Sequence, residues 1–426
     1  MENTSEKTPA YSYYALSLLT FVYVMNFLDR QIIYILFPLM KKEMAFTDTQ
    51  LALLGGTSFA IFYTLLGIPF GRLADKGSRT KLIAAGLAIW SLFSGLTGFA
   101  DGFWTLFACR VMVGVGEATL GPAAISLLAD YFAPSKRATV SSVYSMGIAV
   151  GAGFAALAGG YLSQFGWREA FYIVGFPGVF FAALVFLLRE PVRTKTVDSN
   201  EENFTSAADW KSLLSNRAFI FLCLGYAFLG LATNNISIWG ATFFSRLYNV
   251  SLADYGYWAG IFTLAAGVPA TLFGGAIADW FRRRNAGGRM FYGMLLSLVS
   301  IPCWLAALFS DNFYLILPAG FILLFAALAW LGAAAADATE IAGANLRGLA
   351  VAVYFFTVNI AAYLIGAPLI GKLNDLAGVM TNMQTGVTEN AAMMRYTLLV
   401  CPLSCLIAAV CLWIGSRSSL PVSSRA

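Results

Sequence analysis

Residues 71–81 read GRLADKGSRTK, and residues 274–284 read GGAIADWFRRR. Each segment follows a long apolar run, and the Gly-x-Leu-Ala-Asp of the first aligns with the Gly-x-Ile-Ala-Asp of the second, 204 residues later. A second pair, an Asp followed by an Arg at 130–137 and a Glu followed by an Arg at 340–347, is 210 residues apart. Two matches at nearly equal offsets indicate a duplicated architecture of two related halves.

The composition places these halves in a membrane. Hydrophobic residues make up 59% of the 426 residues and charged residues only 12%, whereas a soluble domain has about 25% charged residues. A helix needs about 20 apolar residues to cross a bilayer, and continuous runs of that length do not fit the alternating strands of a β-barrel. The predicted helices are 13–38, 50–71, 80–99, 103–130, 138–163, 170–189, 217–245, 253–278, 289–309, 313–338, 348–371 and 395–415.

The predicted fold class is therefore an all-α membrane protein with twelve transmembrane helices in two six-helix, pseudo-symmetric halves. The halves are residues 1–189 and 217–426, joined by a polar cytoplasmic linker at 190–216. The N-terminal residues lack the pattern of a cleaved signal peptide. Lys and Arg favour cytoplasmic segments. Of the 27 such residues, 19 lie in the segments on the same side of the membrane as the N-terminus and six in the segments on the opposite side. We expect a multi-pass protein of the cell (inner) membrane with both termini in the cytoplasm.

Several segments resemble signatures of the major facilitator superfamily. GRLADKGSRTK is close to its loop signature, RVMVGVGEA at 110–118 looks like its fourth-helix signature, and GWREAF at 166–171 is similar to a frequent outer-loop motif. The segment 147–160 keeps the glycines of the antiporter signature without its Gly-Pro pair. NFLDRQI at 26–32, with VGVGEA, looks most like the Spinster-like subgroup, whose known animal members are associated with sphingosine-1-phosphate and lysophospholipids. The resemblance covers the whole chain. It implies the major facilitator fold and a central cavity bordered by the first and fourth helices.

Three charged residues lie in the middle of predicted helices, where a charge costs about 2.5–3.5 kcal/mol on insertion scales and marks a functional candidate. Asp29 and Arg30 lie in the first helix and Glu117 in the fourth. Adjacent helical residues point about 100° apart, so Asp29 and Arg30 are expected to contact different partners. The chain has no histidine, so carboxylates must carry proton chemistry near neutral pH. We assign proton coupling to Asp29 and Glu117, and substrate binding to Arg30 with Asn26 and Tyr34 one turn away. The alternative is that these charges only join helices.

Other polar residues in the spans have two interpretations. Arg110 lies nearer one end of its helix, and its chain is long enough to snorkel to the interface. The remaining candidates serve either substrate contact or helix packing and capping. They are Asn234, Asn235, Tyr354 and Asn359.

The charges in the cytoplasmic loops predict a gate. Single exposed ion pairs contribute about 0–1 kcal/mol, but several together bias a nearly balanced equilibrium. We expect two clusters to tie the halves together in the outward-open state. The clusters are Asp75, Asp130 and Arg137 in the first half, and Asp279, Glu340 and Arg347 in the second.

The sequence carries no enzyme signature. The six cysteines all lie in apolar segments, where they are small hydrophobes. A phosphate-binding GxxxxGK[ST] loop and a GxSxG elbow are both missing. We expect no cofactor, no metal, no nucleic acid, and a monomer in the lipid bilayer.

The pattern therefore favours a proton-coupled secondary transporter of a small, anionic, amphipathic substrate. Few amide side chains lie within the spans, whereas a sugar site needs many to replace the hydration of several hydroxyls. An apolar cavity wall suits an alkyl chain, which gains about 0.8 kcal/mol per buried CH₂. The alternatives are a proton-coupled organic-anion or sugar-acid symporter, and a membrane receptor or scaffold without transport.

Overall fold

The computed structural model describes residues 9–191, 207–284, 288–343, 346–381 and 388–418. Within them, twelve helical segments are long and apolar enough to cross a membrane, which confirms the predicted helix count and fold class. The predicted ends are close to the observed ones. The first segment differs most, because it runs from Ala10 to Met44 and extends the predicted run 13–38 at both ends, with three charged residues at 41–43.

The N-terminal half contains six of these spans. Its elements are α1 (Ala10–Met44), α2 (Asp48–Ala52), η1 (Leu53–Thr57), α3 (Ser58–Lys76), α4 (Arg79–Thr97), α5 (Phe103–Glu117), α6 (Leu120–Tyr131), η2 (Pro134–Lys136), α7 (Arg137–Leu162), α8 (Trp167–Gly175) and α9 (Pro177–Phe186).

The C-terminal half contains the other six spans and two short strands. Its elements are α11 (Arg217–Tyr248), α12 (Leu252–Phe262), η3 (Thr263–Gly267), α13 (Val268–Arg284), α14 (Gly288–Phe309), α15 (Phe313–Ala329), α16 (Leu331–Ala342), α17 (Arg347–Asn359), η4 (Ile360–Gly366), α18 (Ala367–Leu376), β1 (Met380–Thr381), β2 (Thr388–Glu389), η5 (Ala391–Met393), α19 (Met394–Thr397) and α20 (Val400–Ser418).

The predicted linker at 190–216 lies largely outside the described residues. Its described end forms α10 (Ala207–Ser215), which contacts α11.

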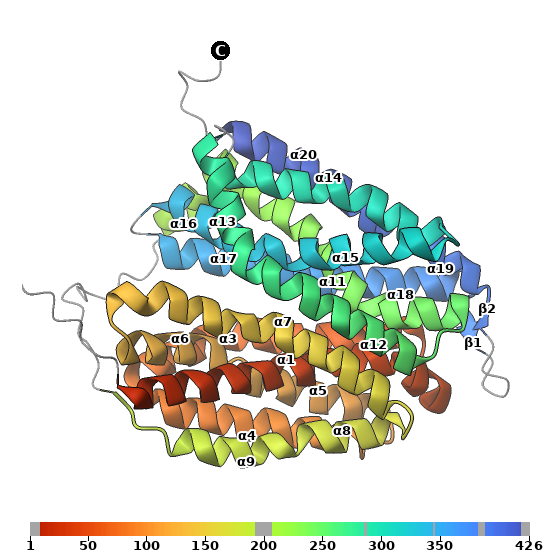
Figure 1. Cartoon of the computed structure of the whole chain (residues 1–426), viewed down its shortest axis with the longest axis horizontal. Helices are drawn as coiled ribbons and strands as arrows, with labels where there is room; N and C mark the ends of the chain where they lie inside the picture. Colours follow the sequence, from red (N-terminus) through yellow and green to blue (C-terminus); the bar gives the residue numbers. More distant parts are fainter. Residues whose placement is uncertain (1–8, 192–206, 285–287, 344–345, 382–387, 419–426) are drawn as a thin grey trace, which may run out of the picture.

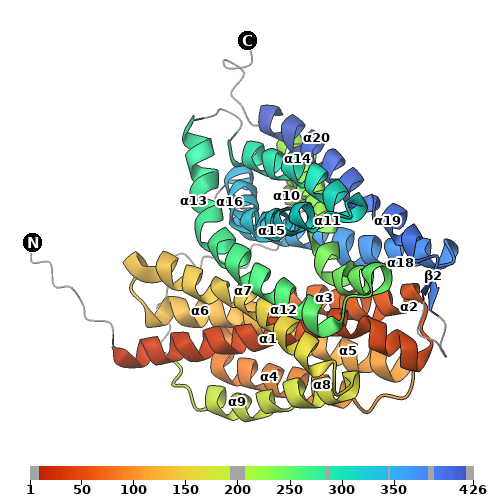
Figure 2. The same ribbon diagram turned by 45° about the vertical axis from the view of Figure 1, so that its right-hand side comes forward.

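The largest contacts between the two halves are those of α1 with α11, α7 with α12, and α2 with α18. Figure 1 shows the red-to-yellow half below the green-to-blue half, with β1 and β2 at one end of the bundle. Figure 2 shows the ribbons of the halves diverging toward the opposite end, where α1 begins and α20 ends. At the α7–α12 crossing, a Cβ on Gly160 would lie 2.8 Å from the Cα of Gly256. Only glycine allows the halves to approach so closely.

Three π-helical turns interrupt the spans near this interface: η1, η3 and η4. Such turns are frequent at functional sites because they shift side chains out of the regular helical register. In η1, a Cβ on Gly56 would lie 3.2 Å from the carbonyl oxygen of Tyr363 in η4. The Oγ1 of Thr57 donates to that same oxygen at 3.0 Å. The irregular turns of the two halves therefore touch directly.

The orientation in the membrane is a prediction with a direct test. Single cysteines at positions 200 and 380, in a variant whose six native cysteines are replaced, are expected to differ in intact cells. A membrane-impermeant thiol reagent should label position 380 and leave position 200 unlabelled until the cells are opened, because Lys and Arg are concentrated on the side of position 200. The opposite labelling pattern would reverse the predicted orientation.

Candidate functional site

A buried ion pair joins α1 to α5 in the middle of the N-terminal half. Arg30 donates from Nε and Nη2 to Oε2 of Glu117, at 2.9 Å and 2.6 Å, and from Nη2 to Oδ1 of Asn26 at 3.3 Å. Glu117 and Asn26 are each 1% exposed and Arg30 is 8% exposed. Arg30 therefore lies beside Asn26, one turn away as its spacing predicted, and Glu117 is its direct ionic partner.

Aromatic rings surround the Arg30 guanidinium. Its Cζ lies 4.7 Å from the ring centre of Phe27, 4.5 Å from that of Phe59 and 4.8 Å from that of Tyr63. Phe59 belongs to α3, whose backbone lies very close to α5. A Cβ on Gly114 would lie only 2.7 Å from the Phe59 carbonyl oxygen. Ring faces attract a cation most strongly where water is excluded, so the cage holds the charge of Arg30 without a second carboxylate.

Asp29 contacts a different helix from Arg30, as predicted. Its Oδ1 accepts a hydrogen bond from the Oγ of Ser94 in α4 at 2.6 Å, and the side chain is fully buried. Among the described residues, Asp29 Oδ2 and Glu117 Oε1 have no hydrogen-bond partner. Each carboxylate thus keeps one oxygen that is able to take a proton.

The expectation that Arg110 snorkels to the membrane interface is wrong. Arg110 is 0% exposed, and none of its guanidinium nitrogens has a hydrogen-bond partner among the described residues. It lies close enough to Asp29, Glu117 and Tyr34 to interact with them electrostatically. We call Asp29, Arg30, Arg110 and Glu117 the buried charge cluster.

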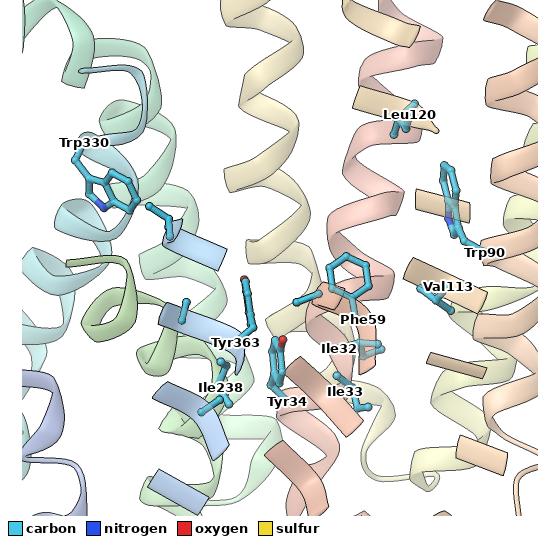
Figure 3. Packing of buried hydrophobic residues seen from close by; sticks show 14 of the residues in the cluster. Ile32, Ile33, Tyr34, Phe59, Trp90, Val113, Leu120, Ile238, Trp330 and Tyr363 are labelled. Atoms are coloured by element: carbon cyan, nitrogen blue, oxygen red, sulfur yellow. The ribbon is translucent and has the colours of Figure 1, made fainter. Parts of the chain in front are cut away.

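Tyr34 does not provide the free donor that its spacing predicted. Its hydroxyl donates to the carbonyl oxygen of Gly55 in η1 at 3.0 Å. Figure 3 shows Tyr34 and Tyr363 near Phe59 where the halves meet. Tyr363, which the sequence did not single out, donates to Oδ1 of Asn234 at 2.8 Å and lies within electrostatic range of Arg30.

The other polar candidates of the C-terminal half are largely engaged within their own helices. The amide nitrogens of Asn234, Asn235 and Asn359 donate to the carbonyl oxygens four residues earlier, at 2.7–2.8 Å. Tyr354 is fully buried and packs edge-on against Tyr226. The packing interpretation therefore describes Asn359 and Tyr354 in this conformation, whereas Asn234 also accepts a hydrogen bond from Tyr363, which belongs to the same half.

The predicted gating clusters each lie within one half. Asp130 accepts from Arg79 at 2.5 Å, and Arg79 also donates to Glu190 at 2.7 Å. Burial raises the pKa of Glu190, but hydrogen bonds from Arg79 and the Thr80 backbone outweigh it and lower that pKa below its usual range. Arg137 donates to the carbonyl oxygen of Ala129 at 3.0 Å.

The second half repeats this arrangement. Arg289 donates to Asp279 at 2.7 Å and to Asp337 and Glu340 at 3.0 Å, and Glu340 also pairs with Arg282. Arg289 follows Arg79 by the same 210 residues that separate Glu340 from Asp130, a signal that was available in the sequence. For Asp75 and Arg347, both exposed, the described residues include no side-chain partner.

A second ionic network joins the halves at the end that carries β1 and β2, which we call the closed end. Asp48 is fully buried and accepts from Lys41 at 2.5 Å, from both terminal nitrogens of Arg246 at 2.6 Å and 2.8 Å, and from Asn374 at 3.0 Å. Asp375 accepts from the backbone nitrogens of Asp48 and Thr49 at the start of α2. Lys41 and Asp48 belong to the first half, whereas the other two donors to Asp48, Arg246 and Asn374, belong to the second. Nothing in the sequence singles out Asp48, because it lies just before the predicted helix 50–71 and an acidic residue is common at any helix start.

No group of three or more His, Cys, Asp or Glu side chains that could hold a metal ion is found among the residues described.

Comparison with known proteins places this geometry in a family. Residues 19–297 match the model of the Major Facilitator Superfamily. An MFS-type efflux pump of Mycolicibacterium smegmatis is 28% identical over 417 residues, covering 96% of this chain and 93% of that protein. Protein spinster homolog 3 of Danio rerio is 28% identical, covering 70% of this chain and 63% of that protein. A crystal structure of a bacterial homolog of the human lysosomal transporter Spinster, inward-facing and unoccupied, superimposes with a TM-score of 0.82 at 26% identity, covering 96% and 98% of the two chains.

Proposed function

This chain belongs to the Major Facilitator Superfamily and is a Spinster-like transporter, and from that premise we propose that it couples proton movement to the transport of a small anionic amphiphile. Transport proceeds by alternating access around the buried charge cluster. The observation that carries the proposal is the Arg30–Glu117 pair, in which the guanidinium inside the aromatic cage is held by a carboxylate whose other oxygen has no partner among the described residues.

Charge balance links the proton to the anion. Two carboxylates and two guanidiniums make the buried charge cluster neutral when all four groups are charged. A proton on Glu117 weakens its hold on Arg30 and leaves a net charge of +1 in a site where uncompensated charge is costly. A phosphate or carboxylate then restores neutrality and pairs with the planar guanidinium fork of Arg30. Proton binding and anion binding therefore favour each other.

The hydrogen bonds of the amide side chains support an amphiphile over a sugar acid. Each of the amide nitrogens of Asn234, Asn235 and Asn359 already donates one hydrogen bond to its own helix. A polyol bound near them leaves hydroxyls without partners, at about 1–3 kcal/mol for each buried group. An alkyl chain carries no such groups and gains about 0.8 kcal/mol per buried CH₂.

The conformation described supports the alternating-access part of the proposal. Asp48 and its partners hold the halves together at the closed end, whereas the ion pairs described at the opposite end lie within one half. With both termini in the cytoplasm, the end opposite the closed end faces inward. The similar bacterial structure is also inward-facing.

The substrate proposal is tested by replacing Arg30. In purified protein in nanodiscs, lysophosphatidate below its micelle concentration is expected to bind, and gluconate to compete poorly. Arg30→Lys keeps the charge but loses the fork, and Arg30→Ala loses both. Hydrogen bonds to charged groups contribute about 1.5–3 kcal/mol, so Arg30→Ala should weaken lysophosphatidate binding at least about tenfold, with Arg30→Lys between the two.

Arg417→Ala is the matched control, because this arginine lies over the Trp413 ring on the exposed surface at 4.4 Å. It should bind like the parent protein. Tight gluconate binding that lysophosphatidate does not displace would favour the sugar-acid symporter. Binding without any uptake or release by proteoliposomes would favour a receptor.

A further inference from the structure

A cavity of about 190 Å³ lies toward the closed end of the bundle, away from the buried charge cluster. The outer turns of α11, α12, α14 and α15 enclose most of it. Its wall is largely apolar and includes the aromatic rings of Trp239, Phe243, Trp258, Phe262 and Trp304. No residue in this wall carries a formal charge, so the cavity suits hydrocarbon and not an ion.

The exposure of Trp258 and the sparse contact between α12 and α15 lead us to infer that the cavity opens toward the lipid between these two helices. The continuous span of α12, η3 and α13 crosses the α15 region closely at Gly267 and Gly274, where an added Cβ would lie 2.8 Å from Leu328 and 2.9 Å from the Cα of Ala329. Toward the closed end, α12 itself hardly contacts α15. Trp258 on this rim is 47% exposed. Both helices are spans, so the opening faces the alkyl chains of one leaflet.

Three polar atoms in the wall are buried and unpartnered. They are Nε1 of Trp239, Nε1 of Trp304 and Oδ1 of Asn235, and none has a hydrogen-bond partner in the described part of the chain. The three side chains are 0%, 5% and 0% exposed. Buried polar groups normally have partners. An ester, hydroxyl or amide would supply partners for these two donors and one acceptor once the side chains turn toward it, whereas a pure hydrocarbon would not.

We propose that this cavity binds the single alkyl chain of an amphiphile that enters from the leaflet at the closed end, with the group linking chain and head placed against Trp239, Trp304 and Asn235. The inference rests on the proposed function and extends it, because Gln31, the neighbour of Arg30 in α1, also lines the cavity. The head group at Arg30 and the chain in the cavity are then parts of one elongated site. Under the predicted orientation, the leaflet is the outer one.

Photolabelling in nanodiscs tests the chain site separately from the head-group site. The probes are a lysophosphatidate and an uncharged monoacylglycerol, each with a diazirine at the end of the same chain. Both are expected to label peptides of α12 and α15 that line the cavity, and excess unlabelled monoacylglycerol should reduce the labelling. Gly320→Trp should remove most of it, because a Cβ on Gly320 meets no atom within 4 Å and the larger ring fills open space in the wall.

Leu315→Trp on the same helix is the control, since Leu315 is 54% exposed and does not line the cavity; its labelling should stay unchanged. Trp304→Phe keeps a ring but removes the N–H. It should weaken the binding of monoacylglycerol roughly threefold to tenfold. The binding of a diazirine-bearing alkane should not change.

The outcomes separate the two proposals. Labelling of the cavity by monoacylglycerol, without saturable lysophosphatidate binding, supports the chain site and contradicts the role of Arg30. Arg30-dependent lysophosphatidate binding whose label maps to other helices, or labelling that Gly320→Trp leaves unchanged, overturns the chain site and leaves the proposed function standing.

Discussion

The Glu117→Gln variant is expected to show a much weaker pH dependence of lysophosphatidate binding than the parent protein and to lose all accumulation driven by a pH gradient. In the parent protein, a charged Glu117 competes with the substrate for Arg30. Protonation removes this competition, so the parent should bind the anion more tightly as pH falls. Gln is a neutral replacement of nearly the same shape, and the variant is therefore fixed in the state that resembles protonated Glu117. Titration of binding against pH, and uptake into proteoliposomes with an imposed gradient, measure the two effects.

Asp29→Asn is expected to lose gradient-driven transport as well, since Asp29 is the second buried carboxylate with a free oxygen. Asp254→Asn is the control, because Asp254 is an exposed carboxylate outside the cluster. Exchange of labelled for unlabelled substrate without a gradient should continue in Glu117→Gln, which shows that the protein still folds and moves. If both cluster variants accumulate substrate normally with a proton gradient, neither carboxylate couples transport to protons.

Most of the fold was predictable because a bilayer leaves few choices. Backbone groups in hydrocarbon must bond internally, so each long apolar run has to be a helix. The duplicated loop motifs then indicated two related halves. Helix ends were less predictable, as the extension of α1 to Met44 shows. Lys41 is polar, yet it continues the helix because Asp48 accepts its hydrogen bond.

The centre of the candidate site was predictable for a similar reason. Charges inside spans are rare, and Asp29, Arg30 and Glu117 were therefore identified by position alone. Asp29 and Arg30 contact different partners because neighbouring residues of a helix point about 100° apart. The partners themselves, Ser94 and the cage ring of Phe59, belong to helices whose sequences carry no special signal at these positions, because serine and phenylalanine are common in any span.

Other features depend on contacts between helices and could not be read from one helix at a time. Arg110 is long enough to snorkel, and only the packing around α5 shows that it is buried. Tyr34 has the right spacing to face the substrate, but the π-helical turn at Gly55 places a carbonyl oxygen within its reach. The Asp48 network requires α2, α11 and α18 to come together, so it exists only in the assembled bundle.

The Asp48→Asn variant is expected to open the closed end. Asp48 is the only carboxylate that contacts both Lys41 and Arg246 in the described network, and its neutralisation leaves two buried cations without their counter-charge. Breaking a buried pair by removing one partner costs about 3–5 kcal/mol, and this cost applies only while the halves are together. A change of about 3 kcal/mol shifts a two-state equilibrium by more than about a hundredfold. Spin labels on cysteines at positions 42 and 392, on the two halves, should therefore move apart in pulsed distance measurements.

Glu43→Gln separates this mechanism from general loss of an ion pair at the same end. Glu43 accepts from Arg168 at 2.9 Å, and both residues belong to the N-terminal half, so this variant should keep the parent distance distribution. Arg246→Gln added to Asp48→Asn removes one of the unpaired cations, and the double variant should shift less than the sum of the two single variants. Unchanged distances in Asp48→Asn, with the protein folded and monodisperse, would show that other contacts hold the closed end, such as the glycine crossing of α7 and α12. Additive shifts in the double variant would instead show that Asp48 acts without Arg246.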